Sequence, residues 1–374
     1  MNLPLKLKKY HCAIEALSPL HIGTGRLNPA CRYVLPPDGK HLGCCLRESW
    51  AARFLRDGSV TPEQYMRKPS PWSRLPGDED ERKKAVAYTL DYTKAGKKLD
   101  KEARPFVRNG FGEAYIPGSS IKGMLRTSLV FSMLVNDEKR KADWQKQFAA
   151  VLDMMKHSNR ENITSIRRKD SARISTIESV FRKRERPDPK NDIMRAVKIG
   201  DTTPADKPLV LSAANVFTSR GDQLQPLGHN TPAAFCELAE PETRFEFDMT
   251  IDESLLESGV LGLDRGVRFR NHIDILLGLQ DHARVMTQFE KAFLRAHNAF
   301  DRVWDKSYES EFDDAVVVRI GWGSGWMGAS LFPILAYDPE DDTPQRPLSR
   351  KMVANSKGDP QMLLGWALLK IQPA

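Results

Sequence analysis

Residues Tyr115–Thr127, YIPGSSIKGMLRT, contain a turn, a helix start and two cations within one short segment. Pro117-Gly118 ends an extended stretch, and Ser119 or Ser120 can accept a hydrogen bond from the first free amides of a helix. Apolar residues then recur at the spacing of one helix face, at Ile121, Met124, Leu125 and Leu129. The segment therefore predicts an extended stretch, a tight turn and an amphipathic helix in succession.

The start of this helix is also a predicted anion-binding site. Unpaired amides give a helix N-terminus about half a positive charge, and Lys122 and Arg126 lie one turn apart. A glycine at position 123 destabilises a helical turn by about 1 kcal/mol relative to alanine. Close approach of another backbone at this position would explain why a glycine is present. The alternative is an ordinary strand–turn–helix junction with solvated cations. The residues predicted to hold a phosphate backbone are Gly118, Ser119, Ser120, Lys122, Gly123 and Arg126.

A glycine-rich segment near the C-terminus predicts a second binding loop. The apolar run at 315–318 has the β-branched content of a buried strand, and RIGWGSGWMG follows it at 319–328. Bare glycine backbone can lie along sugar and phosphate, and tryptophan faces can stack on bases. The alternative is a tight loop whose two tryptophans pack inward. The predicted contacts are Gly321, Trp322, Gly323, Gly325 and Trp326.

A third glycine loop lies near the N-terminus. Alternation from Tyr10 to Leu17 predicts a strand, and SPLHIGTGR follows at 18–26. The three segments, in this order and at these places in the chain, resemble the RAMP superfamily of CRISPR RNA-binding proteins. Within it, the likeness is greatest to the family of fifth Csm subunits of type III-A effector complexes. The residues predicted to contact RNA here are His21, Gly23, Gly25 and Arg26.

The resemblance implies an α+β fold made of tandem ferredoxin-like (RRM-like) domains with helical insertions. We expect an N-terminal domain at 1–203, with charged helical insertions at about 56–105 and 135–195. The C-terminal domain is expected at 204–374, with a helical segment at about 253–306 and the glycine-rich loop at 321–328. Periodicity alone does not fix the strand order.

Several secondary-structure elements are predicted from hydrophobic pattern and turn signals. Arg32–Leu35 and Lys40–Leu46 can pair as a hairpin across a Pro-Pro-Asp-Gly turn, with a helix after them at Arg47–Leu55. The second half of the chain contributes strands and one long helix, predicted at Leu209–Phe217, Thr243–Ile251, Asp281–Trp304 (the helix), Ala315–Arg319 and Gly365–Ile371. The segment from Thr218 to Thr231 is predicted to be a loop.

The resemblance also implies a function. It predicts a noncatalytic subunit that binds the guide RNA (crRNA) near its 3′ end, caps the backbone filament of the complex and supports crRNA maturation in antiviral defence. Expected partners are crRNA, target RNA and the other Csm subunits. One alternative is a metal-independent RAMP endoribonuclease, in which His21 would be the general acid or base. Another is a different type III RAMP subunit, of the Cmr set.

Composition agrees with an anionic partner without identifying it. The chain has 374 residues and a formal charge of +8, which would suit DNA or a membrane surface as well as RNA. A basic tract at 160–186 could add RNA contacts or be a solvated face. No stretch has the roughly 18 consecutive apolar residues of a membrane span, and no signal peptide is evident, so we expect a cytoplasmic protein without membrane contact.

The cysteines and histidines do not indicate a metal or cofactor. The five cysteines have no C-x-x-C spacing, which disfavours a zinc knuckle and predicts buried reduced thiols. The eight histidines are scattered, and His272, His282 and His297 are too far apart for a one-turn ligand pair. We therefore predict no metal site and no cofactor.

Overall fold

The computed structural model describes most of the chain. The described residues are 6–36, 42–92, 99, 102–139, 141–142, 145–146, 192–227, 234–256, 271–310, 314–329, 331, 349–355 and 358–374. The basic tract at 160–186 and most of the predicted insertion at 135–195 lie outside them.

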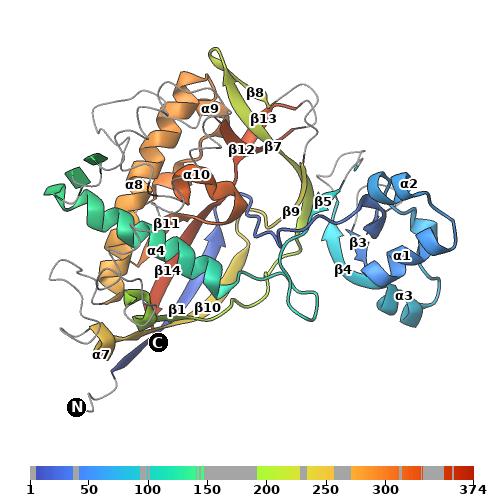
Figure 1. Ribbon diagram of the computed structural model, residues 1–374, viewed down its shortest axis with the longest axis horizontal. Helices are drawn as coiled ribbons and strands as arrows, with labels where there is room; N and C mark the ends of the chain where they lie inside the picture. Colours follow the sequence, from blue (N-terminus) through green and yellow to red (C-terminus); the bar gives the residue numbers. More distant parts are fainter. Residues whose placement is uncertain are drawn as a thin grey trace.

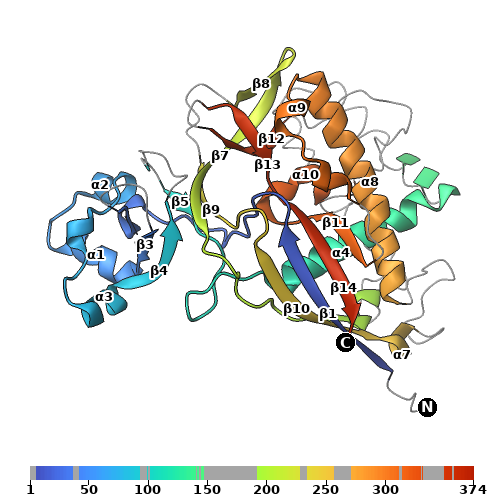
Figure 2. The same cartoon turned by 180° about the vertical axis from the view of Figure 1, so that it is seen from behind.

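Five antiparallel strands form the main sheet, in the order β11-β14-β1-β10-β6. Two long helices, α4 (Gly118–Val135) and α8 (His272–Ala296), lie on one face of this sheet (Figure 1). Figure 2 shows the sheet from its other side. The strands are β1 (Leu7–Ala16), β6 (Val197–Ile199), β10 (Arg244–Asp252), β11 (Ala315–Arg319) and β14 (Trp366–Pro373).

The path of the chain through this sheet is that of one βαββαβ unit. β1 leads through α4 to β6, and β10 leads through α8 to β14, with β11 added at the edge. The order β14-β1-β10-β6 is the split βαβ arrangement of a ferredoxin-like fold. The predicted α+β class is confirmed. Strands from both sides of residue 203 build this sheet, so the predicted boundary at 203/204 does not divide it, and the division into tandem domains stays a prediction.

Alternation along β10 explains why the sheet has a buried and an open face. Phe245, Phe247 and Met249 are buried beneath the helices, whereas Glu246 and Asp248 are exposed. α4 buries the apolar stripe predicted for it, and α8 buries its own against the same sheet. The core is therefore a helix layer packed on a sheet layer.

A second, larger sheet takes strands from the first, middle and last parts of the chain. Its path runs β13-β12-β7-β4-β3-β2, while β8 and β9 pair with β7, and β5 pairs with β9. Its strands are β2 (Tyr33–Val34), β3 (Leu42–Leu46), β4 (Val86–Asp91), β5 (Ala103–Arg104), β7 (Val210–Arg220), β8 (Gln223–Pro226), β9 (Ala234–Leu238), β12 (Ser349–Ala354) and β13 (Pro360–Leu363).

One end of this sheet belongs to a lobe that stands beside the main body (Figure 1). This satellite lobe, residues 29–36 and 42–92, packs α1 (Glu48–Arg56), α2 (Pro62–Arg67) and α3 (Glu79–Ala85) around β2, β3 and β4. Its small core is separate from the main one and consists of Cys31, Val34, Cys44, Leu46, Ala51, Phe54 and Ala85. The predicted insertion at 56–105 is thus partly an ordered component of a lobe.

Short helices complete the described chain. They are α7 (Glu253–Leu256), α9 (Phe300–Val303), α10 (Gly325–Gly328), and the 3-10 helices η1 (Ala30–Arg32), η2 (Trp72–Arg74), η5 (Ile193–Ala196), η6 (Lys306–Glu309) and η7 (Gly321–Ser324).

Most predicted elements are confirmed, and two are corrected. The hairpin of β2 and β3, helix α1, and strands β7, β10, β11 and β14 lie where they were predicted. The long helix begins earlier, at His272, where the Asn271 side chain caps it, and ends before Asn298, whose φ of 50° is left-handed. The predicted loop 218–231 was wrong in part, because β7 continues to Arg220 and turns into β8.

Candidate nucleic-acid interface

The N-terminal and C-terminal glycine loops are brought together by the fold. The Trp322 amide donates a hydrogen bond to the His21 carbonyl at 2.8 Å, and Gly365 donates one to the Pro19 carbonyl at 3.0 Å. Gly321 has a φ of 76°, and a Cβ there would lie only 2.5 Å from the His21 carbonyl oxygen. A glycine is therefore required where the two loops touch. We call residues 21–27 and 321–325 together the loop junction.

His21 is part of the interior of this junction. Its side chain is 2% exposed, and Nδ1–H donates to the Glu237 carbonyl at 2.9 Å. Its ring lies edge-on to Phe106 and to Trp322. Burial lowers the pKa of His21 to about 4, so the imidazole is neutral near pH 7. A buried, neutral ring fits a positioning role better than the general acid or base role of the endoribonuclease alternative.

The ring of Trp322 makes cation–π contacts with two side chains of the protein. Lys351 Nζ lies 4.1 Å from the centre of the indole ring, and the Arg104 guanidinium carbon lies 5.2 Å from it. Lys351 Nζ also donates to the Trp322 carbonyl at 2.8 Å. The expected stacking of bases on Trp322 thus competes with these two cations. The side chain of Trp326, the other predicted stacking residue, lies outside the described side chains.

Arg104 and Lys351 are residues that the sequence did not single out. Both charges lie close enough to His21 to lower its pKa further. The Arg104 Nε is buried and has no hydrogen-bond partner within the part of the chain that the structure describes. Arg104 lies in a predicted insertion, and Lys351 lies in a strand that contains none of the three motifs. No sequence signal therefore predicted that these two residues lie beside the glycine loops. Together they give the loop junction a positive rim.

The outer part of the junction is open to solvent. Gly23, Thr24, Gly25 and Arg26 are all exposed, and Gly25 has a left-handed φ of 78°. Among the residues that the structure describes, no heavy atom beyond the chain neighbours of Gly25 lies within 4 Å of a Cβ built there. This stretch of backbone can therefore be approached closely by another molecule, and its contact with phosphate stays a prediction.

The first amides of α4 are capped by a different group from the one predicted. Pro117 is the N-cap, and neither Ser119 nor Ser120 makes a side-chain cap. Instead, the Gly118 amide donates to Asp201 Oδ1 at 2.8 Å. A Cβ on Gly118 would lie 2.6 Å from the backbone carbonyl oxygens of Ile199 and Gly200, at the end of β6. The glycine is therefore needed for a close approach within the protein itself. The serine cap was wrong because an acidic side chain from a distant segment reaches the first amide.

Lys122 and Arg126 point into the protein. Lys122 Nζ donates to the Val197 carbonyl at 2.8 Å, and burial lowers the pKa of this lysine. Arg126 donates to both carboxylate oxygens of Asp192 at 3.0 and 2.7 Å. Both cations tie α4 to η5 and β6. Gly123, by contrast, is exposed, and no atom of the described residues outside its own helix lies within 4 Å of a built Cβ, so the described chain leaves that surface open to another molecule.

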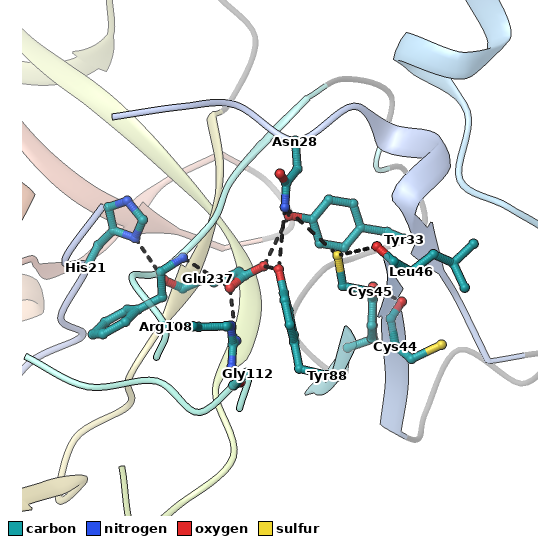
Figure 3. Close-up of polar contacts among 12 residues, drawn as sticks. His21, Asn28, Tyr33, Cys44, Cys45, Leu46, Tyr88, Arg108, Gly112 and Glu237 are labelled. Carbon is teal, nitrogen blue, oxygen red and sulfur yellow. Dashed lines mark hydrogen bonds and ion pairs between the residues drawn. The ribbon is translucent and has the colours of Figure 1, made fainter. Parts of the chain in front are cut away.

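A buried carboxylate links the satellite lobe to the junction (Figure 3). Glu237 is fully buried and accepts hydrogen bonds from Tyr33, Tyr88 and Arg108. Its second oxygen also accepts from the Phe106 amide at 3.0 Å. Since Tyr33 and Tyr88 belong to the lobe while the other donors belong to the segment beside the junction, this one side chain fixes their relative position.

A second buried carboxylate supports the C-terminal glycine loop. Glu290 of α8 binds Arg319 at 2.8 Å and Arg350 at 2.6 Å, and all three side chains are almost fully buried. Arg319 also donates to the carbonyls of Gly323 and Leu364, at 2.6 and 3.1 Å. Although burial opposes ionisation of Glu290, the two arginines outweigh it and lower its pKa. The loop is therefore anchored to α8 by charge-assisted bonds.

Other site types receive no support in the described residues. The described residues contain no group of three or more potential metal ligands and no helix long and apolar enough to cross a membrane. All five cysteines are buried and free of disulfides. Burial raises the pKa of Cys45 to about 12, so it is not a reactive thiolate.

Comparison with models of protein families shows the family of the chain. The family model of the RAMP superfamily matches residues 13–327. The chain belongs to the RAMP superfamily. The match contains the N-terminal loop, the segment at 115–127 and all but the last residue of the C-terminal glycine loop, so the resemblance to this superfamily is confirmed. No curated protein matches the chain significantly.

Two solved structures share the fold. A chain of a cryo-EM structure of a Csm–crRNA–target RNA ternary complex of a type III-A CRISPR-Cas system matches with a TM-score of 0.61 and 19% identity, over 96% of this chain and 100% of that one. The crystal structure of T. onnurineus Csm5 matches with a TM-score of 0.56 and 21% identity, over 95% of this chain and 99% of that one. At such identities the likeness concerns the fold.

Proposed function

We propose that this RAMP protein is a noncatalytic subunit of a type III-A effector complex. In this proposal it binds crRNA near its 3′ end, caps the backbone filament and supports crRNA maturation in antiviral defence. Target RNA and other Csm subunits are its further partners. The full-length likeness to Csm5 and to a chain of a crRNA-containing complex supports the assignment of the subunit.

The observation that carries the RNA-binding part is the loop junction. Exposed glycine backbone lies beside Arg26, while Arg104 and Lys351 add charge behind it. Backbone amides and cations contact phosphates without reading bases, which suits a protein that must accept guides of any sequence. The internal roles of Lys122 and Arg126 leave the exposed Ser119 and Gly123 as the contacts offered by the start of α4.

Binding of RNA by the loop junction can be tested with a pair of charge-matched variants. Arg26→Ala/Arg104→Ala removes two junction cations, whereas Arg56→Ala/Arg302→Ala removes two exposed arginines from α1 and α9. Two charge-assisted contacts predict at least about a tenfold loss of affinity for single-stranded RNA in the first variant. Equal losses in the two variants, with melting temperatures preserved, would refute a role for the junction.

The subunit assignment has a separate test. Coexpression with the other subunits of a type III-A complex should yield particles whose copurified RNAs have a common length, with this chain at one end of the filament. Loss of the chain should change that length. A monomer that neither assembles nor carries RNA would contradict the proposal. Position elsewhere in a Cmr-type particle would favour the other type III subunit.

The endoribonuclease alternative is addressed by incubation of the purified protein with repeat RNA in EDTA. We expect no cleavage, because a buried His21 with a pKa of about 4 supplies no proton near neutral pH. Cleavage that is abolished by His21→Ala would establish the enzyme.

A further inference from the structure

One large apolar side chain projects fully into solvent. Phe111 is 90% exposed, and no other exposed large apolar residue in the described chain exceeds 55%. It lies in the turn Asn109-Gly110-Phe111-Gly112, within the segment that leads from β5 to α4 and projects from the body in Figure 1. Burial of such a ring against a partner would be favoured by the hydrophobic effect, so the ring is available as a contact.

The turn that carries Phe111 is preorganised. Asn109 Oδ1 accepts hydrogen bonds from the amides of Phe111 and Glu113 at 2.9 and 3.0 Å. The Asn109 amide donates to the Glu113 carbonyl at 2.9 Å, which closes the turn. Gly112 has a φ of 84°, and a Cβ there would lie 2.7 Å from the Ala87 carbonyl. The ring is thus presented from a defined backbone.

The base of the turn is tied to the buried carboxylate. Arg108 donates to the Gly112 carbonyl at 3.0 Å and to Glu237 at 3.0 Å (Figure 3). Its guanidinium also lies 3.5 Å from the centre of the Tyr88 ring. Because these contacts already order the turn, less conformational entropy is lost when a partner binds to it.

The turn begins at the loop junction. The Val107 amide donates to the Ile22 carbonyl at 2.8 Å, and Phe106 pairs with Gly23. From Val107 to Phe111 the chain can span at most about 13 Å. An RNA strand that follows the exposed glycines of the junction would therefore pass close to the ring.

The surroundings favour a base as the partner of this ring. Glycines on both sides leave the ring faces uncovered, and the remaining turn residues are polar. A protein interface of ordinary size would need hundreds of square ångströms of complementary surface, whereas one aromatic ring suffices to stack on a base. We propose that Phe111 stacks on an unpaired base of the RNA held at the loop junction. This inference rests on the proposed RNA-binding function.

The experiment combines a protein change with an RNA change. The affinity of Phe111→Ala for a set of single-stranded RNAs, each with one abasic nucleotide at a different position, is compared with that of the unmodified protein. Phe111→Ala should lose about tenfold in affinity for intact RNA, while Phe111→Trp should retain it. One abasic position should weaken the unmodified protein by a similar factor and leave Phe111→Ala unaffected. Leu277→Ala, which removes another exposed apolar side chain, should change nothing.

The outcomes separate this inference from the proposed function. If the unmodified protein binds RNA tightly but Phe111→Ala binds equally well, stacking by Phe111 is refuted while RNA binding stands. The same holds if Phe111→Ala loses only assembly with protein subunits, which would make the ring a protein anchor. If the unmodified protein does not bind RNA, both are refuted.

Discussion

Replacement of Arg126 separates a structural from an RNA-binding role at the start of α4. Arg126 and Asp192 form a two-pronged ion pair with side-chain exposures of 17% and 12%. Loss of one partner costs about 3–5 kcal/mol for a fully buried pair and about 0–1 kcal/mol for an exposed one. For this largely buried pair we expect Arg126→Ala to cost about 2–3 kcal/mol, which for a chain of 374 residues corresponds to a fall in melting temperature of roughly 3–4 °C.

The assay is thermal unfolding and RNA binding measured on the same samples. Asp192→Asn keeps an oxygen for the Met194 amide, which Asp192 caps, but removes the charge that Arg126 needs. A double-mutant cycle with Arg126→Ala should give a coupling of about 1–3 kcal/mol. RNA affinity at about 150 mM salt should fall no more than for the exposed control Arg56→Ala. An unchanged melting temperature together with a tenfold loss of RNA affinity would refute this reasoning and place the guanidinium on the phosphate backbone.

Three further predictions concern charge. RNA affinity should fall at least about tenfold between about 50 and 200 mM salt, and a scrambled RNA of equal length should bind equally well in a filter or anisotropy assay. Urea unfolding should show stability declining as pH falls from about 6.5 towards 4, because the unfolded His21 gains a proton in this window while the folded residue, with a pKa of about 4, does not. In His21→Gln this dependence should be shallower. Glu290→Gln should destabilise the protein by about 3–5 kcal/mol, since it leaves Arg319 and Arg350 buried without a full counter-charge; a melting temperature within 2 °C of the unmodified protein's would contradict this.

The sequence by itself was sufficient for local elements whose signals are short-range. Alternation of Phe245, Phe247 and Met249 with charged residues gave strand β10, and the apolar stripe after Pro117 gave helix α4. The three glycine and cation motifs led to the RAMP superfamily, which the family model confirms. These inferences succeed because period and turn chemistry are written in neighbouring residues.

The partners of individual side chains were not accessible in this way. Whether Lys122 and Arg126 face solvent or η5 depends on Asp192 and on the path of β6, which lie more than sixty residues further along the chain. The segments joined at the loop junction are about 300 residues apart, and Arg104 and Lys351 carry no local signal of their place beside Trp322.

The tertiary structure also decided which strands pair with one another in the main sheet. The first strand, β1, lies between β14 from the C-terminus and β10 from the middle of the chain, so the main sheet joins the two predicted halves. The sequence was sufficient for the elements with strong local patterns because backbone geometry responds to neighbouring residues, whereas the strands β4, β5, β8, β9, β12 and β13 were not predicted. Pairing, burial and the direction of each cation depend instead on contacts between distant segments, which form only once the whole chain is packed.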